Sequence, residues 1–315
     1  MHIPDGFLSP RVAVAAWVVA GAGVAAALRA ERRDPAPASA SLLGSLAAFL
    51  FAAQMVNVPV APGTSGHLVG ATLAAVLVGP WRALIVMAVV LAIQALLFQD
   101  GGIAAYGANL SDMGVVGCFA GYALAWLVSR WIRGLRGHAA GAMLGAFLST
   151  VVAATLASLW LAFSGLYPLG GILPLMISTH AVIGVLEAAL TGAILVTVLR
   201  WRPDLVRGLA RAGAGPESRR PVGRTLLGVA LVVAAFLAPL ASSLPDGLEH
   251  TAHILGFASR QHPLVASPLA GYSLPLGALT PVAPAVAGIL GALVVAGLAW
   301  AVSRGLADRS DGAHR

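Results

Sequence analysis

The sequence contains no lysine, because all nineteen basic residues among its 315 positions are arginine. A phosphate-binding loop of the Walker A type needs its lysine to reach the phosphates. The chain therefore cannot be an ATPase of that kind, and any ATP-driven work must come from a partner protein.

Charged residues and cysteine are also scarce. Only 10% of the residues are charged and 59% are hydrophobic, whereas a soluble domain carries about 25% charged residues. This composition indicates a membrane protein with several spans. Aromatic residues make up 6% of the chain, and this low content together with the long unbroken apolar runs excludes a transmembrane β-barrel. The single cysteine, Cys118, cannot form an intrachain disulfide and is expected to serve in packing.

The formal net charge of +7 does not indicate nucleic-acid binding. Nearly all arginines lie in short segments between apolar runs, which is the pattern that orients a membrane protein. The 37 glycines suit close packing of helices in lipid, where small residues let backbones approach.

Nine apolar segments are long enough, or nearly so, to cross a membrane. They are residues 11–28, 40–58, 67–80, 83–98, 109–129, 139–163, 174–199, 224–241 and 278–302. With nine spans and an external N-terminus, only Arg11 and Arg260 lie outside the cell. Merging the third and fourth spans into one helix bent at Pro80 would reverse the orientation of every later segment and place most arginines outside, against the positive-inside rule. The sequence predicts an all-α polytopic transmembrane helix bundle of about seven spans plus a two-span C-terminal module.

The connection after the seventh span divides the chain. Its content of arginine, glycine and proline is typical of a linker. We therefore predict a metal-binding seven-helix membrane module over residues 1–200, an Arg-rich cytoplasmic linker over 201–223, and a two-helix module over 224–315. The last module carries the sequence PDGLE at positions 245–249, in a segment predicted to be external.

The opening sequence MHIPDGFLSP places a histidine at position two. It has neither the basic region nor the cleavage site of a signal peptide, and Met1 is expected to be retained because His2 is not small. A free amine, the His2 backbone nitrogen and the His2 ring can then form two fused chelate rings on one metal. Square-planar nitrogen geometry suits Ni(II) and Cu(II), and such a chelate leaves one position open. The alternative is an exposed terminal histidine without a role.

A second histidine, His67, follows GTSG at the external mouth of the third predicted span. The topology places it on the same face as the N-terminus, so Met1, His2 and His67 are the candidate metal ligands. The alternative is that His67 is an ordinary polar residue at the end of a span. Nitrogen ligands suit a divalent transition metal better than Mg²⁺ or Ca²⁺, which prefer oxygen.

Six further polar residues are candidates for orienting these ligands: Asn57, Ser65, Asp100, Asn109, His180 and Glu187. His180 and Glu187 lie seven positions apart on one helix, so they share a face. Ionisable residues within a span are functional candidates. The alternative is hydrogen bonding between helices that fixes the bundle. His250, His253 and His262 are expected to be solvated loop residues, and the alternative is that the spacing of His250 and His253 suits one helix face and a loose metal relay.

Two other classes of function fit part of the sequence. A serine after glycine on one span and a histidine on a later one are typical of an intramembrane serine protease, and Ser65 with His180 would fill these roles. This interpretation leaves the opening motif, His67 and the second module unexplained. A purely structural membrane subunit predicts no particular N-terminus.

Four segments resemble the substrate-capture membrane component of cobalt and nickel energy-coupling-factor transporters. They are MHIPDGFLSP at the N-terminus, VPVAPGTSGHLVGA at 58–71, FQDGGIAAYGAN at 98–109 and STHAVIGVLEAALTG at 178–192. This resemblance covers residues 1–200. The segment SSLPDGLEHTA at 242–252 resembles the small two-helix auxiliary subunit of these systems, here fused.

The resemblance implies a square-planar site for Ni(II) or Co(II) as the transported substrate. Its ligands would be the amine of Met1, the amide nitrogen and ring of His2, and the ring of His67. The implied partners are two ATPase subunits and a coupling transmembrane subunit in a bacterial inner membrane, and the chain itself is no enzyme. FQDGG departs at Gln99 from the FADGG usual in that family. The choice between nickel and cobalt, the use of the metal in cobalamin, hydrogenase or urease, and whether the second module loads the metal or gates a loop all stay open.

Overall fold

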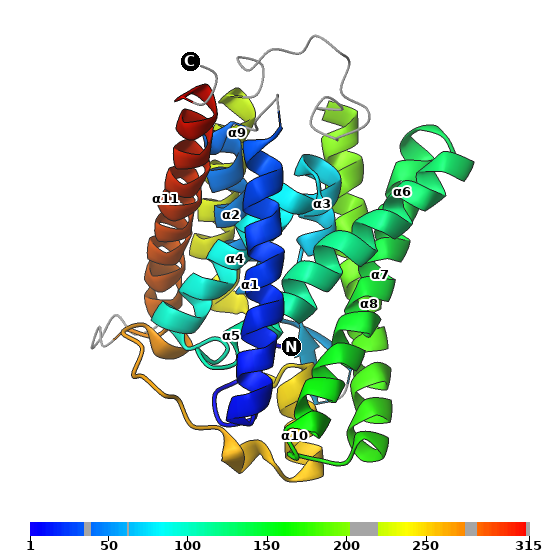
Figure 1. The fold of residues 1–315 in the computed structure, drawn as a ribbon, viewed down its shortest axis with the longest axis vertical. Helices are drawn as coiled ribbons and strands as arrows, with labels where there is room; N and C mark the ends of the chain where they lie inside the picture. The colour runs from blue at the N-terminus through cyan, green and yellow to red at the C-terminus, as the bar shows by residue number, and fades with distance from the viewer. Residues whose placement is uncertain (35–38, 62, 202–219, 275–281, 313–315) are drawn as a thin grey trace.

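The computed structural model describes residues 1–34, 39–61, 63–201, 220–274 and 282–312. These residues form a bundle of helices with one small hairpin of two strands (Figure 1). Within the described ranges, seven helices are long and apolar enough to cross a membrane. The chain is therefore a multi-pass helical membrane protein, and the predicted fold class is confirmed.

The described residues of the first module form eight α-helices, two π-helical stretches that continue them and the two strands. These are α1 (Pro10–Arg32), α2 (Ala40–Gln54), β1 (Val58–Ala61), β2 (Thr64–Gly66), α3 (Ala71–Val78), α4 (Pro80–Ile93), η1 (Gln94–Phe98), α5 (Tyr106–Asn109), η2 (Leu110–Ala120), α6 (Gly121–Trp131), α7 (Gly134–Phe163) and α8 (Leu169–Trp201).

The described part of the second module contains two long helices joined by an irregular segment with short helices. Its elements are α9 (Arg220–Val232), η5 (Val233–Leu237), η6 (Ala238–Leu240), α10 (Gly247–Leu255), η7 (Ala258–Arg260), η8 (Ala270–Tyr272) and α11 (Ala283–Gly312). Most of the predicted linker 201–223 lies outside the described residues.

Each of the nine predicted spans contains a helix, but two of these helices are shorter than predicted. Helix α2 has 15 residues, and α3 has only eight because residues 67–70 are not helical. Gly70 has φ +73°, a left-handed conformation that glycine adopts readily, and α3 begins directly after it. The third predicted span is therefore a non-helical stretch followed by a short helix, and His67 lies in the non-helical part.

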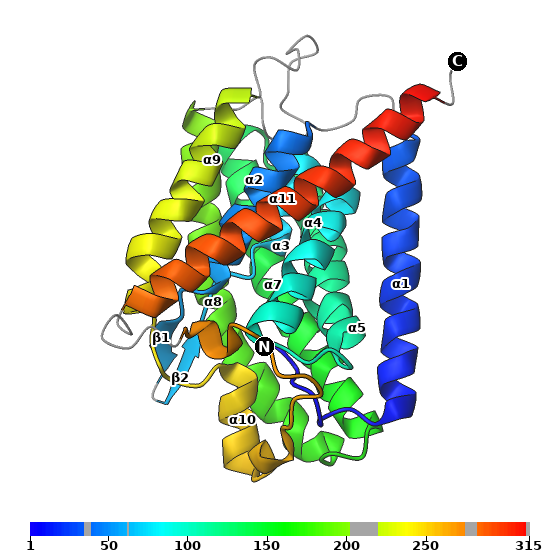
Figure 2. The ribbon, with the colours of Figure 1, turned by 90° about the vertical axis from the view of Figure 1, so that its left-hand side faces the viewer.

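The loop predicted before His67 is a β-hairpin. Strands β1 and β2 pair in antiparallel fashion, with Val58 opposite Gly66 and Pro59 opposite Ser65 (Figure 2). The hairpin lies at the same end of the molecule as α10. It fixes the path of the backbone into His67.

The two ends of the bundle differ in charge. The C-terminal ends of α1 and α8 and the connection between α6 and α7 lie at one end, opposite the hairpin (Figure 1). Arginine occupies the last turns of α1, α6 and α8. This clustering fits the positive-inside rule, which predicts that the hairpin end faces outward.

The second module packs directly against the first. Helices α9 and α11 lie against α2, and α11 crosses it obliquely (Figure 2). A Cβ atom at Gly44 of α2 would lie 2.7 Å from the carbonyl oxygen of Ala296 in α11. Glycine therefore permits this close approach of the two backbones.

Candidate metal centre

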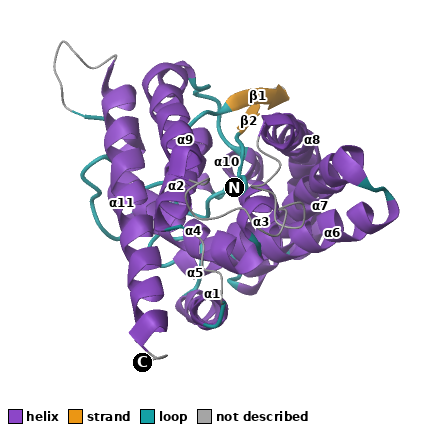
Figure 3. Cartoon of the chain, turned by 90° about the horizontal axis from the view of Figure 1, so that it is seen from above, coloured by secondary structure: helices purple, strands orange, loops and turns teal. Residues whose placement is uncertain are grey.

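The first residues of the chain are inserted into the bundle. The N-terminus lies near the centre of the helices when they are seen end on (Figure 3). Met1, His2 and Ile3 are 7%, 8% and 0% exposed, although chain termini usually lie at the surface. Gly6, with φ +93°, bends the chain between this segment and α1.

Backbone hydrogen bonds hold the inserted segment. The Asn109 side chain accepts from the Ile3 N–H at 2.7 Å and donates to the Ile3 carbonyl oxygen at 3.0 Å. The Asp5 carboxylate accepts from the N–H groups of Ile103 and Ala104 at 3.2 and 2.8 Å. These contacts fix the backbone on the C-terminal side of His2.

His2 lies between a carboxylate and the second histidine. Its Nδ1 atom is 3.0 Å from Oδ1 of Asp100, whose Oδ2 accepts from the Tyr272 hydroxyl at 2.6 Å. The rings of His2 and His67 stack with centroids 5.7 Å apart and planes inclined by 24°. The Nε2 atom of His2 is buried and has no hydrogen-bond partner.

The loop after His67 is held by buried polar side chains from three helices. The Glu187 carboxylate accepts from the N–H groups of Val69 and Gly70 at 2.7 and 2.9 Å. Gln54 donates to the carbonyl oxygen of Val69 at 2.8 Å and accepts from Gln94 at 2.8 Å. Glu187 therefore positions the loop that carries His67 rather than contacting His2.

Burial lowers the pKa of His2, which favours its neutral ring. Neutral imidazole is a common metal ligand.

The terminal amine of Met1 pairs with the second module. Its nitrogen lies 2.5 Å from Oδ2 of Asp246, the aspartate of PDGLE. Burial alone would raise the pKa of the Asp246 carboxyl, but the Met1 ammonium holds this pKa well below its ordinary value. Sequence patterns gave no sign of this contact, because the two residues are 245 positions apart.

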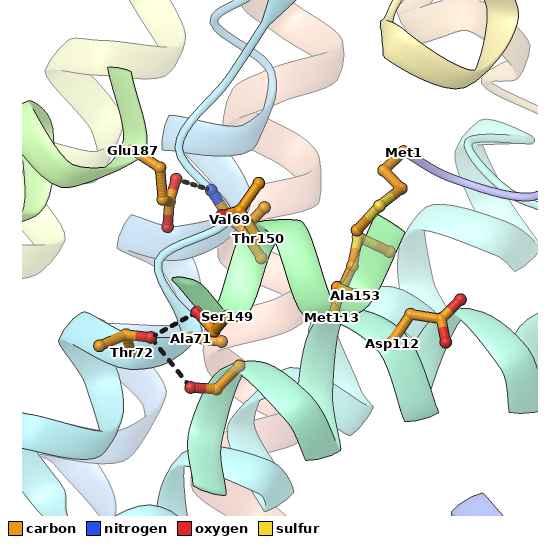
Figure 4. Close-up of a pocket in the computed structure, with 11 residues that line it drawn as sticks. Met1, Val69, Ala71, Thr72, Asp112, Met113, Ser149, Thr150, Ala153 and Glu187 are labelled. Atoms are coloured by element: carbon orange, nitrogen blue, oxygen red, sulfur yellow. Dashed lines mark hydrogen bonds between the residues drawn. The ribbon is translucent and has the colours of Figure 1, made fainter. Parts of the chain in front are cut away.

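Two cavities adjoin Met1. One is lined by Ser65, His67, His180 and Asp246, among others. The other lies between α3, η2, α7 and α8 and has polar lining residues that include Glu187 and Thr72 (Figure 4). Met1, Val69 and Thr150 line both cavities, so Met1 lies where the two cavities adjoin.

The structure brings together most of the predicted site residues. Asp100 contacts His2, Asn109 contacts Ile3, and Glu187 holds the loop of His67. Asn57 does not contact the candidate ligands: its carbonyl oxygen accepts from the Ser242 N–H, and its buried Oδ1 atom has no partner.

The geometry does not support a serine protease. The Ser65 hydroxyl donates to the carbonyl oxygen of Leu244 at 2.7 Å, and Nδ1 of His180 lies 2.8 Å from the carbonyl oxygen of Met176. Among the described residues no hydrogen bond joins Ser65 to His180. Without that bond the histidine cannot take the proton of the nucleophile.

Two known protein families match the chain. The family described as "Cobalt uptake substrate-specific transmembrane region" matches residues 2–205, and the PDGLE domain matches residues 220–308. A putative fused nickel transport protein of Archaeoglobus fulgidus is 34% identical over 310 residues, which cover 96% of this chain and 98% of that protein. The cobalt transport protein CbiM of Geobacter sulfurreducens is 34% identical over 73% of this chain and 68% of its own length.

A solved crystal structure of a transition metal transporter has a similar fold. It superposes with a TM-score of 0.56 at 29% identity, covering 70% of this chain and 99% of the other. The matched region of the first family contains the buried histidine pair, and the second contains Asp246. The chain therefore belongs to the cobalt uptake substrate-specific transmembrane family of nickel and cobalt transport proteins, with a PDGLE domain in the same polypeptide.

Proposed function

We propose that this chain captures Ni(II) or Co(II) from outside the cell as the substrate-binding component of an ATP-driven importer of the energy-coupling-factor type. The metal is held by the amine of Met1, the backbone nitrogen and ring of His2, and the ring of His67. The buried stacking of His2 on His67 beside the terminal amine carries this proposal. Two ATPase subunits and a coupling membrane subunit would supply the energy, since this chain has no lysine for a Walker A loop.

The donor chemistry supports a metal of this class. Among the described residues no group of three or more His, Cys, Asp or Glu side chains converges as a metal site. The proposed site draws instead on the terminal amine and a backbone nitrogen together with two imidazoles, and such a nitrogen set suits Ni(II) and Co(II) better than Mg²⁺ or Ca²⁺.

Metal binding would exchange two contacts seen in the structure. The fused chelate uses Nδ1 of His2, which now faces Asp100 at 3.0 Å. It also uses the Met1 amine, which now pairs with Asp246. Both contacts are with carboxylates, so negative charge lies beside the incoming cation and favours its approach.

The full chain in detergent is expected to bind one Ni(II) or Co(II) ion tightly and not to bind Mg²⁺. Calorimetric titration with each ion, and competition between them, measures this. A chain that binds none of the ions, or that binds Mg²⁺ as well as nickel, would contradict the proposal. Binding that persists in Ser65→Ala, with no peptide cleavage by either protein, would exclude the protease.

The substitution Glu187→Gln is expected to weaken nickel binding by about tenfold, because partners that orient ligands contribute 10–100-fold to affinity. The amide presents a donating NH2 group in place of one of the two carboxylate oxygens that accept from Val69 and Gly70, so one of these hydrogen bonds is lost. Thr191→Val is the matched control, since Thr191 is buried on the same helix and its hydroxyl has no partner. Equal affinity in the two variants would show that Glu187 does not position His67.

A further inference from the structure

The segment that carries PDGLE docks on the hairpin next to the candidate ligands. The Ser65 N–H donates to the carbonyl oxygen of Pro245 at 2.9 Å, and the Ser65 hydroxyl donates to that of Leu244 at 2.7 Å. The segment therefore runs along the strand that leads into His67. Its next two residues, Asp246 and Gly247, line the cavity shared with Met1 and His67.

Asp246 uses its two carboxylate oxygens for different purposes. Oδ1 caps helix α10 by accepting from the N–H groups of Leu248 and Glu249 at 2.7 and 2.9 Å. Oδ2 faces the Met1 amine. The cap fixes the side chain, so this second oxygen is held in the cavity by the geometry of the helix start.

His180 presents a free ring nitrogen to the same cavity. Its Nδ1 atom donates to the carbonyl oxygen of Met176 at 2.8 Å, which leaves the lone pair on Nε2. This Nε2 atom has no partner, and the residue is 1% exposed. A buried polar atom without a partner is uncommon, and an imidazole lone pair is a metal ligand.

The glycine of PDGLE leaves room for this nitrogen. A Cβ atom at position 247 would lie 2.7 Å from Cε1 and 2.9 Å from Nε2 of His180. Any other residue at Gly247 would press on the ring. His180 of the first module and the backbone next to Asp246 of the second are therefore in direct contact.

We propose that His180 Nε2 and the Asp246 carboxylate form a loading subsite for the transported divalent transition metal at the junction of the two modules. Imidazole with carboxylate suits such an ion. From this subsite the ion passes to Met1, His2 and His67, which line or adjoin the same cavity. The inference rests on the proposed capture function, and it gives the second module a role in the rate of capture.

A loading subsite changes how fast the metal arrives and leaves without changing the final site. His180→Gln keeps a donor for Met176 but removes the imidazole. We expect the association and dissociation rate constants for Ni(II) to fall together by about tenfold, within the range that local electrostatics gives to association rates, with an unchanged Kd. Stopped-flow competition of the full chain against a metal-sensitive dye measures both constants.

Asp246→Asn is the second variant. Asparagine is as good a helix cap as aspartate, so α10 is preserved while the negative charge is lost. Its association rate is expected to fall by about the same factor. His253→Gln is the matched control, because His253 is an exposed histidine of the same helix α10 and does not line the cavity.

The subsite is contradicted if His180→Gln and Asp246→Asn associate with nickel as fast as the control. It is also contradicted if His180→Gln raises Kd through faster dissociation alone, since that result makes His180 a support of the final site. If the capture proposal itself is wrong, the unsubstituted chain shows no tight binding of nickel. This result differs from both outcomes that contradict the subsite.

Discussion

Adding one methionine before Met1 is expected to lower the affinity of the chain for Ni(II) by more than about a hundredfold, because loss of groups that merely orient ligands already costs 10–100-fold. The extra residue moves the amine away from the backbone nitrogen and ring of His2, and the fused chelate cannot form. The first residues are buried and held through Ile3 and Asp5, so the segment has no room to shift by one position. Calorimetric titration of both proteins gives the comparison, and mass spectrometry confirms their N-termini.

A matched control separates the amine from general damage to this segment. Arg11→Gln alters an exposed residue at the start of α1 and leaves the first ten residues in place. It is expected to bind nickel like the unsubstituted chain. Full nickel affinity in the extended protein would eliminate the terminal amine as a ligand, even if His2 and His67 stayed essential.

Replacing His67 by alanine is expected to abolish tight binding of both Ni(II) and Co(II), again by more than about a hundredfold. His67 supplies a ligand from a separate segment, so its loss leaves the metal with the N-terminal chelate alone. The fold should survive, because the loop is held by Glu187 and Gln54 through backbone groups of residues 69 and 70.

The control for this substitution is His138→Ala, which removes a half-buried histidine near the start of α7, far in sequence from the candidate ligands. Metal titration of the two variants, with their thermal unfolding midpoints compared, measures the effect. If His67→Ala bound nickel as tightly as His138→Ala, the stacked pair would have no part in holding the metal.

Much of the fold follows from local sequence. Each apolar run became a helix because a backbone in lipid must satisfy its hydrogen bonds within the segment. The runs did not predict that residues 67–70 would break the third helix, since the glycine that ends the break, Gly70, is one of many in the chain. Glu187 and Gln54 supply the missing hydrogen bonds of this stretch, and both are distant in sequence.

The candidate ligands could be proposed from the sequence because each depends on features of its own segment. His2 follows the terminal amine directly, and the charge pattern of the loops placed His67 on the same face. Asp100 and Asn109 were identified by polarity next to apolar runs, and the structure gives each a contact in the N-terminal segment. Asn57 has the same polarity but contacts the second module instead, and polarity alone cannot separate these cases.

By itself, the sequence determined a helical membrane protein and predicted two histidines on one face. Composition, hydrophobic periodicity and the placement of arginines are local features of the sequence, and they can be recognised without knowledge of any tertiary contact. Only the tertiary structure decided what surrounds the N-terminus: Asp246 against the Met1 amine, the free nitrogen of His180, and Tyr272 on Asp100. The contacts of Asp246 with Met1 and of Tyr272 with Asp100 join residues 172 or more positions apart. They form because α9 and α11 pack on α2 and bring PDGLE next to the inserted terminus.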